Sequence, residues 1–237
     1  PLTQIDRQNF SQLRVIWRWR LPDQEILRRE ENIRNRPFRG TPLEIGGVLY
    51  TSTPLGLVAA LDAATGKELW VFDPEVWKKK EESWGMHRGV AYWSGGREER
   101  ILLGTNTDYL YSLDARTGRP DSLFGEGGRV DLTKGLRRPF QSSSYAVISP
   151  PLVCGEVVVV GSTVDDMRGE PVPRLMPPGD VRGFDVYTGK QLWVFQTIPQ
   201  QGEFGNNTWG AEAWKDFGNA NVWSMMSADP ELGYVYL

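Results

Sequence analysis

Histidine and cysteine, two side chains often used in catalysis and metal binding, are scarce in this chain. It has one histidine, His87, and one cysteine, Cys154. These counts exclude an internal disulfide framework, a cysteine-rich zinc site and a metal site that needs two histidines. An imidazole can carry a proton near neutral pH, but a structural or lining role is the preferred interpretation of His87. Arg88 directly precedes an apolar stretch, residues 89–93, and a guanidinium that enters a buried strand needs a partner for its charge.

Composition narrows the class of protein. The 27 basic and 30 acidic residues give a net charge of −3, so bulk electrostatics attracts no nucleic acid and no nucleic-acid partner is expected. The longest aliphatic run, residues 157–160, is far shorter than the ~18 residues that span a bilayer. The 26 glycines and 16 prolines favour frequent turns, and the ten tryptophans need positions in which to pack. These features predict a turn-rich, all-β fold.

A repeat organises the expected strands. The pattern Asp-x-x-Thr-Gly-[Lys/Arg] occurs at residues 62–67, 114–119 and 185–190. Trp70 and Trp193 follow the first and third copies, the middle copy ends in Phe124, and a partial copy near the start carries Trp17. The copies recur about every 50 residues, which is typical of repeat architectures. The longer last step indicates an insertion, placed at about residues 165–179.

Each repeat predicts four antiparallel strands. The Asp, Thr and Gly residues predict a tight turn with side-chain bonds to the backbone and Gly at positive φ. The turn joins two strands, and two further strands precede this pair. Four strands per repeat indicate a β-propeller blade. The expected blades lie near residues 1–20, 41–73, 88–124, 149–196 and 221–237.

The length allows about four to five blades. A propeller closes into a ring, because an open arc exposes strand edges. Pro1 at the start and an apolar alternation at residues 233–237 indicate that both ends lie inside a longer protein. Part of a larger ring is therefore expected, with a half-ring that dimerises as the alternative.

Several segments carry a family resemblance. The repeat Ala-x-Asp-x-x-Thr-Gly-x-x-x-Trp, the segment Arg-Gly-Val-Ala-Tyr-Trp at residues 88–93 and Asn-Val-Trp at residues 221–223 resemble the eight-bladed quinoprotein dehydrogenases. That family includes glucose and alcohol dehydrogenases that use pyrroloquinoline quinone (PQQ). The resemblance covers the whole chain, and it implies an eight-bladed ring in which Trp17, Trp70 and Trp193 dock neighbouring blades.

The resemblance also implies cofactor-binding residues. Arg88 corresponds to the arginine that pairs with a PQQ carboxylate, which a guanidinium can grip with two bonds. Trp223 corresponds to the indole that forms a floor under the PQQ rings. Thr163 would contact PQQ, and Asn221 would line the site.

A metal ion belongs to the same implied site. The family uses Ca²⁺ (or Mg²⁺), a hard cation that polarises the reactive carbonyl. Asp166 is the expected ligand, with Asp165 as its competitor; an acidic turn without a metal is the alternative interpretation. The family's catalytic aspartate base corresponds to a position beyond Leu237. No catalytic residue is therefore expected in this chain, and the isolated fragment is expected to be inactive.

Several positions depart from the family pattern. Glu82 and Ser83 stand where alcohol-oxidising relatives have adjacent cysteines. Trp84 replaces the histidine of the glucose-oxidising branch, and Arg39 replaces a glutamate that faces PQQ. The substrate class is therefore open between sugars and alcohols.

The expected function is part of a PQQ- and Ca²⁺-dependent dehydrogenase. It would oxidise a sugar or alcohol hydroxyl by hydride transfer to the quinone and pass electrons to a quinone or cytochrome c. A periplasmic location is expected, and a missing N-terminal segment could associate with the membrane. The alternative is a non-catalytic propeller scaffold that binds a partner. Arg88 and Trp223 discriminate between the two, because a scaffold has no need of a cation and an indole on the ring axis.

Overall fold

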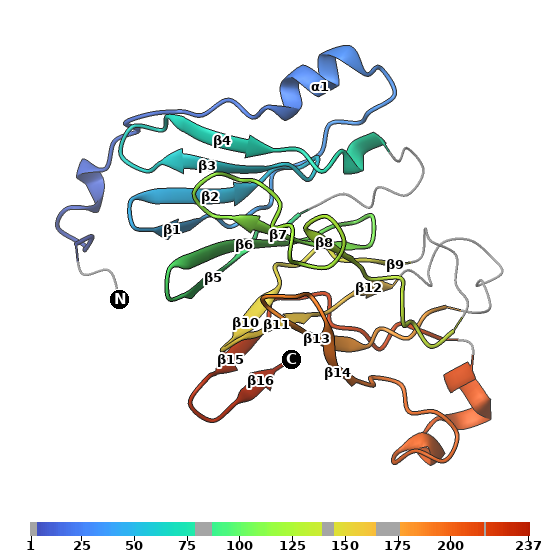
Figure 1. Cartoon of the computed structure of the whole chain (residues 1–237). Helices are drawn as coiled ribbons and strands as arrows, with labels where there is room; N and C mark the ends of the chain where they lie inside the picture. The colour runs from blue at the N-terminus through green and yellow to red at the C-terminus, as the bar shows by residue number, and fades with distance from the viewer. Residues whose placement is uncertain (1–3, 79–86, 139–144, 165–175, 216) are drawn as a thin grey trace.

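Three four-stranded antiparallel sheets follow one another along the chain (Figure 1). The computed structural model describes residues 4–78, 87–138, 145–164, 176–215 and 217–237. In each sheet the strands pair in sequence order. The first sheet contains β1 (Leu43–Ile45), β2 (Val48–Ser52), β3 (Val58–Asp62) and β4 (Glu68–Phe72).

The second and third sheets repeat this order. The second contains β5 (Ala91–Gly95), β6 (Glu98–Gly104), β7 (Tyr109–Asp114) and β8 (Arg129–Asp131). The third contains β10 (Leu152–Cys154), β11 (Val157–Val160), β13 (Val181–Asp185) and β14 (Gln191–Phe195). The last strand of the second sheet thus lies beyond Phe124.

Shorter elements complete the described chain. Two two-stranded sheets are formed by β9 (Tyr145–Ala146) with β12 (Thr163–Val164) and by β15 (Ser227–Asp229) with β16 (Tyr234–Tyr236). The helices are η1 (Phe10–Gln12), α1 (Asp23–Arg29), η2 (Val76–Lys78), η4 (Asn206–Thr208) and η5 (Gly210–Lys215). The segment before α1 contains η1 but no strand in its described residues. The all-β prediction is confirmed, and α1 is one short helix at the surface (Figure 1).

The repeated turns have the geometry that the sequence predicts. The Asp62 carboxylate accepts hydrogen bonds from the Thr65 amide at 2.8 Å and the Thr65 hydroxyl at 2.7 Å. Gly66 adopts a φ of 70°, a conformation that costs other residues roughly 1 kcal/mol or more. The hydrogen bonds from Thr65 hold the pKa of Asp62 below its usual value. The turns at residues 114–119 and 185–190 have the same bonds and the same positive φ.

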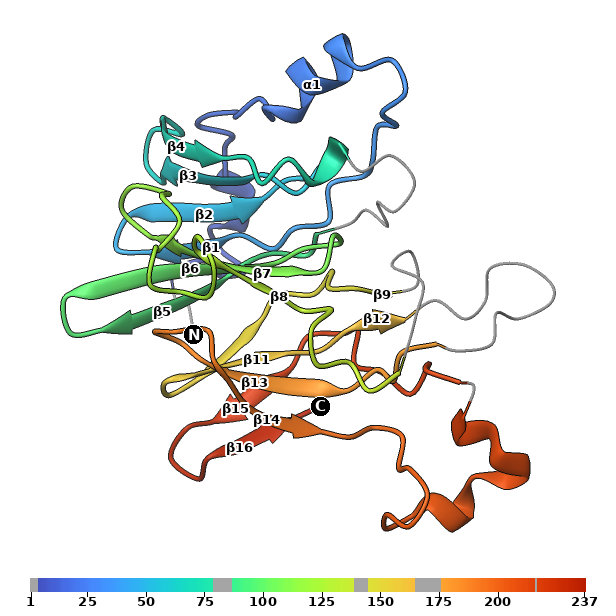
Figure 2. The same cartoon turned by 45° about the vertical axis from the view of Figure 1, so that its right-hand side comes forward.

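The sheets lie face to face in a stack (Figure 2). Buried side chains of the first and second sheets form one hydrophobic cluster, and those of the second and third form another. Ile101 and Leu102 are neighbours on β6 but belong to different clusters, because successive side chains of a strand point to opposite faces. The second sheet is therefore buried on both faces.

Aromatic rings pack on the turn glycine of the sheet that follows them in the chain. The Trp70 indole donates to the Ala115 carbonyl at 3.0 Å, and a Cβ placed on Gly118 would lie 2.5 Å from Cε3 of that ring. Trp17 has the same relation to the first turn, with its indole N–H 3.1 Å from the Ala63 carbonyl. Phe124 approaches Gly189 of the third turn. Each contact needs a residue without a side chain at the turn.

This contact predicts a specific intolerance at Gly118. We expect Gly118→Ala to destabilise the protein by about 3 kcal/mol, because the methyl group strains a positive φ and also overlaps the Trp70 ring. Gly96→Ala is the matched control, since Gly96 has a φ of 65° but nothing within 4 Å of the added atom. That control is expected to lose about 1 kcal/mol. Urea unfolding measures both; equal losses would contradict the role of the indole contact.

Candidate functional site

Backbone hydrogen bonds join the segments that precede β1, β5 and β10, the first strands of the three four-stranded sheets. The Thr41 amide, before β1, donates to the Arg88 carbonyl at 2.8 Å, and Thr41 also forms a parallel bridge with Gly89. The Arg88 amide donates to the Ile148 carbonyl at 3.0 Å, just before β10. Gly89 has a φ of 145°, and a Cβ there would lie 3.0 Å from the Thr41 carbonyl oxygen. A glycine therefore permits this close approach of two chains.

The segment before β15 joins the same line of residues. The Ser149 hydroxyl donates a short hydrogen bond to the Trp223 carbonyl. Arg88 donates to that carbonyl as well, with Nη1 at 2.7 Å. The Trp223 carbonyl oxygen therefore accepts hydrogen bonds from residues that precede β5 and β10, and it lies on the segment that leads to β15. The sequence analysis did not identify this role of Ser149, which begins a Ser-Pro-Pro motif at residues 149–151.

Arg88 and Trp223 form the centre of the candidate site. They are 135 residues apart in sequence, yet the guanidinium carbon lies 4.7 Å from the centre of the indole ring. Such a cation–π contact is worth roughly 0.5–2 kcal/mol. The Trp223 side chain remains 52% exposed. The arrangement presents a permanent positive charge and a flat aromatic surface to a ligand.

Electrostatics at Arg88 is set by burial and by another arginine. Burial lowers the pKa of the half-buried Arg88 guanidinium, and the positive charge of Arg39 lowers it further. An arginine remains charged at physiological pH despite such shifts. Within the part of the chain that the structure describes, neither Arg39 nor Arg88 forms an ion pair with a carboxylate.

Asn221 and Thr163 belong to a second group of residues in the candidate site. The Asn221 amide donates to the Ser162 carbonyl at 2.7 Å, which ties the end of β11 to the segment that carries Trp223. A Cβ on Gly161 would lie only 2.2 Å from the Val222 carbonyl oxygen, so these two backbones touch. The hydroxyls of Ser162 and Thr163 are buried without a hydrogen-bond partner among the described residues.

The predicted metal ligands cannot be placed. Asp165 and Asp166 lie outside the described residues. Among the residues that are described, no group of three histidine, cysteine, aspartate or glutamate side chains is arranged to hold a metal ion. The metal site therefore stays a prediction from the family resemblance.

His87 is buried beside the site and does not face solvent. Its side chain is 2% exposed, and burial lowers the pKa of the imidazole from 6.5 to about 4. Hydrogen bonds to the Asn106 side chain and the Gly104 backbone oppose that shift only partly. Nε2 points at Gly56, where an added Cβ would lie 2.8 Å away. This environment favours a neutral, structural histidine.

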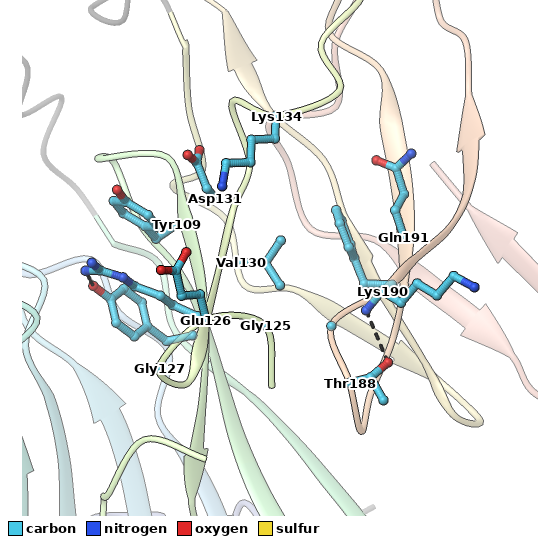
Figure 3. A pocket seen from close by; sticks show the side chains of 14 residues that line it. Tyr109, Gly125, Glu126, Gly127, Val130, Asp131, Lys134, Thr188, Lys190 and Gln191 are labelled. Atoms are coloured by element: carbon cyan, nitrogen blue, oxygen red, sulfur yellow. Dashed lines mark hydrogen bonds between the residues drawn. The ribbon is translucent and has the colours of Figure 1, made fainter. Parts of the chain in front are cut away.

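A separate cavity lies between the second and third sheets. It has a volume of about 680 Å³ and opens between β8 and the turn that leads into β14 (Figure 3). Arg129 packs over the Tyr109 ring at 4.4 Å and bonds the Tyr111 hydroxyl at 3.1 Å. Lys134 and Asp131 face the opening from the same side, and Lys190 lies across from them (Figure 3). None of the predicted site residues lines this cavity.

A succession of stacked four-stranded antiparallel sheets is typical of a β-propeller. The whole chain, residues 1–237, matches the PQQ family described as the glucose/ethanol/alcohol dehydrogenase β-propeller domain. The chain therefore belongs to the PQQ-dependent quinoprotein dehydrogenase family.

Known relatives are similar over the full chain. Quinoprotein glucose dehydrogenase A of Acinetobacter calcoaceticus is 30% identical over 256 residues, covering 100% of this chain and 30% of that protein. Quinohemoprotein alcohol dehydrogenase ADH IIB of Pseudomonas putida is 31% identical over 250 residues, covering 100% of this chain and 31% of that protein. The solved quinohemoprotein alcohol dehydrogenase ADHIIG of Pseudomonas putida superposes with a TM-score of 0.62 at 28% identity, over 83% of this chain and 27% of that one. The chain thus spans about a third of the curated relatives it matches.

The buried histidine predicts a pH dependence of stability. Because the folded pKa of His87, about 4, lies below its unfolded value of 6.5, the stability present above pH 6.5 is lost as the pH falls toward 4. We expect a loss of about 2 kcal/mol between pH 7.5 and pH 5. Urea unfolding at the two pH values measures it.

His87→Asn supplies the control for that measurement. The raised pKa of Asp23, caused by burial, works in the opposite direction and stabilises the fold as the pH falls. The Asp23 contribution is common to both proteins, so the difference between them isolates His87. An equal pH dependence in wild type and variant would contradict the buried, neutral state.

Proposed function

We propose that this chain is the part of a PQQ- and Ca²⁺-dependent dehydrogenase that carries one side of the cofactor site. The whole protein would oxidise a hydroxyl group of a sugar or an alcohol. The observation that carries the proposal is the pairing of Arg88 with the half-exposed indole of Trp223, at a guanidinium-to-ring distance of 4.7 Å. Membership of the family supports the assignment of a ligand to that pair.

The residues present fit a flat, anionic cofactor. PQQ is a planar quinone with carboxylate groups; when bound, it supplies the acceptor for the hydride of the substrate. The exposed Trp223 indole offers an area for stacking, and Arg88 can exchange part of its contact with that ring for a carboxylate. The hydroxyls of Ser162 and Thr163, which have no hydrogen-bond partner among the described residues, are donors on the adjoining segment.

The role of this chain's own residues is to bind and orient. Arg88 is anchored by the Trp223 carbonyl, so a ligand held by its guanidinium is also fixed relative to the indole. Asn221 holds the segment of Ser162 and Thr163 next to Trp223. The proposed ligand of Ca²⁺ is Asp166 or its neighbour Asp165, and the aspartate base is proposed to lie beyond Leu237.

The proposed architecture is an eight-bladed ring docked by aromatic residues. The contacts of Trp17, Trp70 and Phe124 with the next turn support it. Trp193 is 37% exposed and is proposed to dock on a turn of the following blade. Electron transfer to a quinone or cytochrome acceptor and a periplasmic location belong to the same proposal and rest on the family alone. No helix in the described ranges is long and apolar enough to cross a membrane.

Titration with PQQ tests the cofactor assignment. In the full-length protein with Ca²⁺ present, we expect Arg88→Gln to weaken PQQ binding by roughly 10-fold or more, because a charge-assisted hydrogen bond is lost. Trp223→Ala removes the stacking surface and is expected to weaken binding by roughly 3- to 10-fold. Isothermal calorimetry measures the affinity without requiring turnover.

Two variants control for charge and for tryptophan loss. Arg97→Gln removes an exposed arginine in the turn after β5, and Trp19→Ala removes an indole that bonds Glu68. Neither residue contacts Arg88 or Trp223, so both variants should bind PQQ as the wild type does. If Arg88→Gln and Trp223→Ala also bind like the wild type, the cofactor role of the pair is wrong.

A further inference from the structure

Two consecutive arginines hold the ends of one long segment of the chain. After β14 the chain leaves the stack of sheets, passes through η4 and η5 and returns toward β15 (Figure 2). We call residues 198–217 the excursion. Arg137 donates to the Ile198 carbonyl at its beginning, and Arg138 donates to three carbonyls near its end. Neighbouring cations thus hold both ends of the same segment.

Arg137 fixes where the excursion begins. Its guanidinium forms a bidentate ion pair with Asp180, with Nε and Nη2 each 2.9 Å from a carboxylate oxygen. The Asp180 side chain is only 4% exposed, and its carboxylate also accepts a hydrogen bond from the Thr197 amide at 3.2 Å. A buried, doubly bonded pair of this kind belongs to the fold itself, because loss of one partner would leave an uncompensated charge.

Arg138 fixes where the excursion ends. Its Nη1 donates to the Trp214 carbonyl at 3.0 Å and forms a short hydrogen bond with the Lys215 carbonyl. Its Nη2 donates to the Phe217 carbonyl at 2.6 Å. The last carbonyls of a helix lack partners within the helix and carry its partial negative charge. The guanidinium supplies both the donors and the opposite charge, and it reaches the three carbonyls from two separate nitrogen atoms.

Hydrophobic burial does not fix this part of the excursion. No side chain described between residues 201 and 217 is buried, and the Phe204 side chain is fully exposed. A segment that buries little apolar surface opens locally at a low cost in free energy. Its position therefore depends on the hydrogen bonds at its two ends, and those from Arg138 lie closer in sequence to Trp223.

The segment after the excursion carries the indole of the candidate site. Residues 217–223 form neither helix nor strand, so no ladder of backbone hydrogen bonds guides them. The Gly179 amide donates to the Gly218 carbonyl at 3.1 Å. A Cβ on Gly218 would lie 2.1 Å from a backbone carbonyl oxygen, so two chains touch there. Arg138 makes the first of the contacts that hold this segment, which ends at Trp223.

We propose that Arg138 is a positioning residue for the cofactor site. By holding the end of the excursion, it sets the path of residues 217–223 and thereby the position of the Trp223 indole beside Arg88. The inference rests on the proposed function and deepens it, because that function assigns the indole as the stacking surface for PQQ. Arg138 acts through the backbone, so its loss reduces the fraction of molecules in which the indole is in place.

Hydrogen exchange of the full-length apoprotein, followed by mass spectrometry, tests the positioning step without the cofactor. In Arg138→Gln we expect the amides of residues 213–223 to exchange roughly 10-fold faster, because hydrogen bonds that oppose local opening are lost. Arg138→Lys keeps the charge but carries its donors on one nitrogen, so an intermediate rate is expected. The amides of β2 and β3 should exchange as they do in the wild type.

Calorimetric titration of the same full-length variants with PQQ, in the presence of Ca²⁺, tests the consequence for the site. Arg138→Gln is expected to weaken PQQ binding by roughly 3- to 10-fold, since only molecules with the indole in place bind fully. Arg138→Lys should recover part of that loss, and it carries the same test if Arg138→Gln does not fold.

Arg129→Gln is the matched control. It also removes a guanidinium that bonds a neighbouring side chain and covers an aromatic ring, but Arg129 lines the cavity between the second and third sheets. This variant should leave both the PQQ affinity and the exchange of residues 213–223 unchanged.

Three results would contradict the proposal. Unchanged exchange of residues 213–223 in Arg138→Gln would show that Arg138 does not hold the segment. Faster exchange spread evenly over all the sheets would show a role in the stability of the whole fold. Faster exchange of the segment alone, with a PQQ affinity equal to that of Arg129→Gln, would show that the segment does not position the indole.

Failure of the proposed function is distinguishable from failure of this inference. In the first case Arg88→Gln and Trp223→Ala also leave the PQQ affinity unchanged. If those two variants lose affinity and Arg138→Gln does not, only the positioning role of Arg138 is wrong.

Discussion

The stack of sheets depends on one kind of contact, the packing of an aromatic ring on the glycine of a turn. Asp62 and Thr65 close their turn with two hydrogen bonds, and Gly66 takes a positive φ within it. A glycine leaves the backbone open, so the Trp17 indole can lie against it and donate to Ala63. The repeat therefore encodes both a turn and the surface on which a neighbouring aromatic ring packs. Because the second and third turns receive Trp70 and Phe124 from the preceding repeat, the sheets cannot slide independently.

Regular stacking has a consequence at the opposite side of the repeat. The packing that fixes the position of each turn on the next sheet also aligns the starts of the first strands, β1, β5 and β10. Thr41, Arg88 and Ile148 consequently join in a chain of backbone hydrogen bonds. The site thus lies where the repeats meet, and its residues are distant in sequence. Arg88 and Trp223 meet across 135 residues for this reason.

The sequence predicted those parts of the fold that are local or repeated. Turn geometry follows from an Asp-x-x-Thr-Gly pattern because the bonds join residues three apart. Nothing in the spacing could predict that Ser149 and Arg88 share the Trp223 carbonyl, because that contact depends on how the sheets stack. Arg88 and Trp223 were found through family motifs, whereas Asp165 and Asp166 lie outside the described residues and their role stays a prediction.

The electrostatics at the strand starts differs in kind from that of the turns. At Asp62 the hydrogen bonds from Thr65 stabilise the charged carboxylate and lower its pKa, so charge and fold support each other. At Arg88 burial and Arg39 both lower the pKa, so the environment opposes the charge. A fold selected for stability alone would place a carboxylate beside such a guanidinium or replace it with a neutral residue. A charged group that its surroundings oppose is typical of functional sites, because an arriving anion then gains an ion pair that the described residues do not form with Arg88.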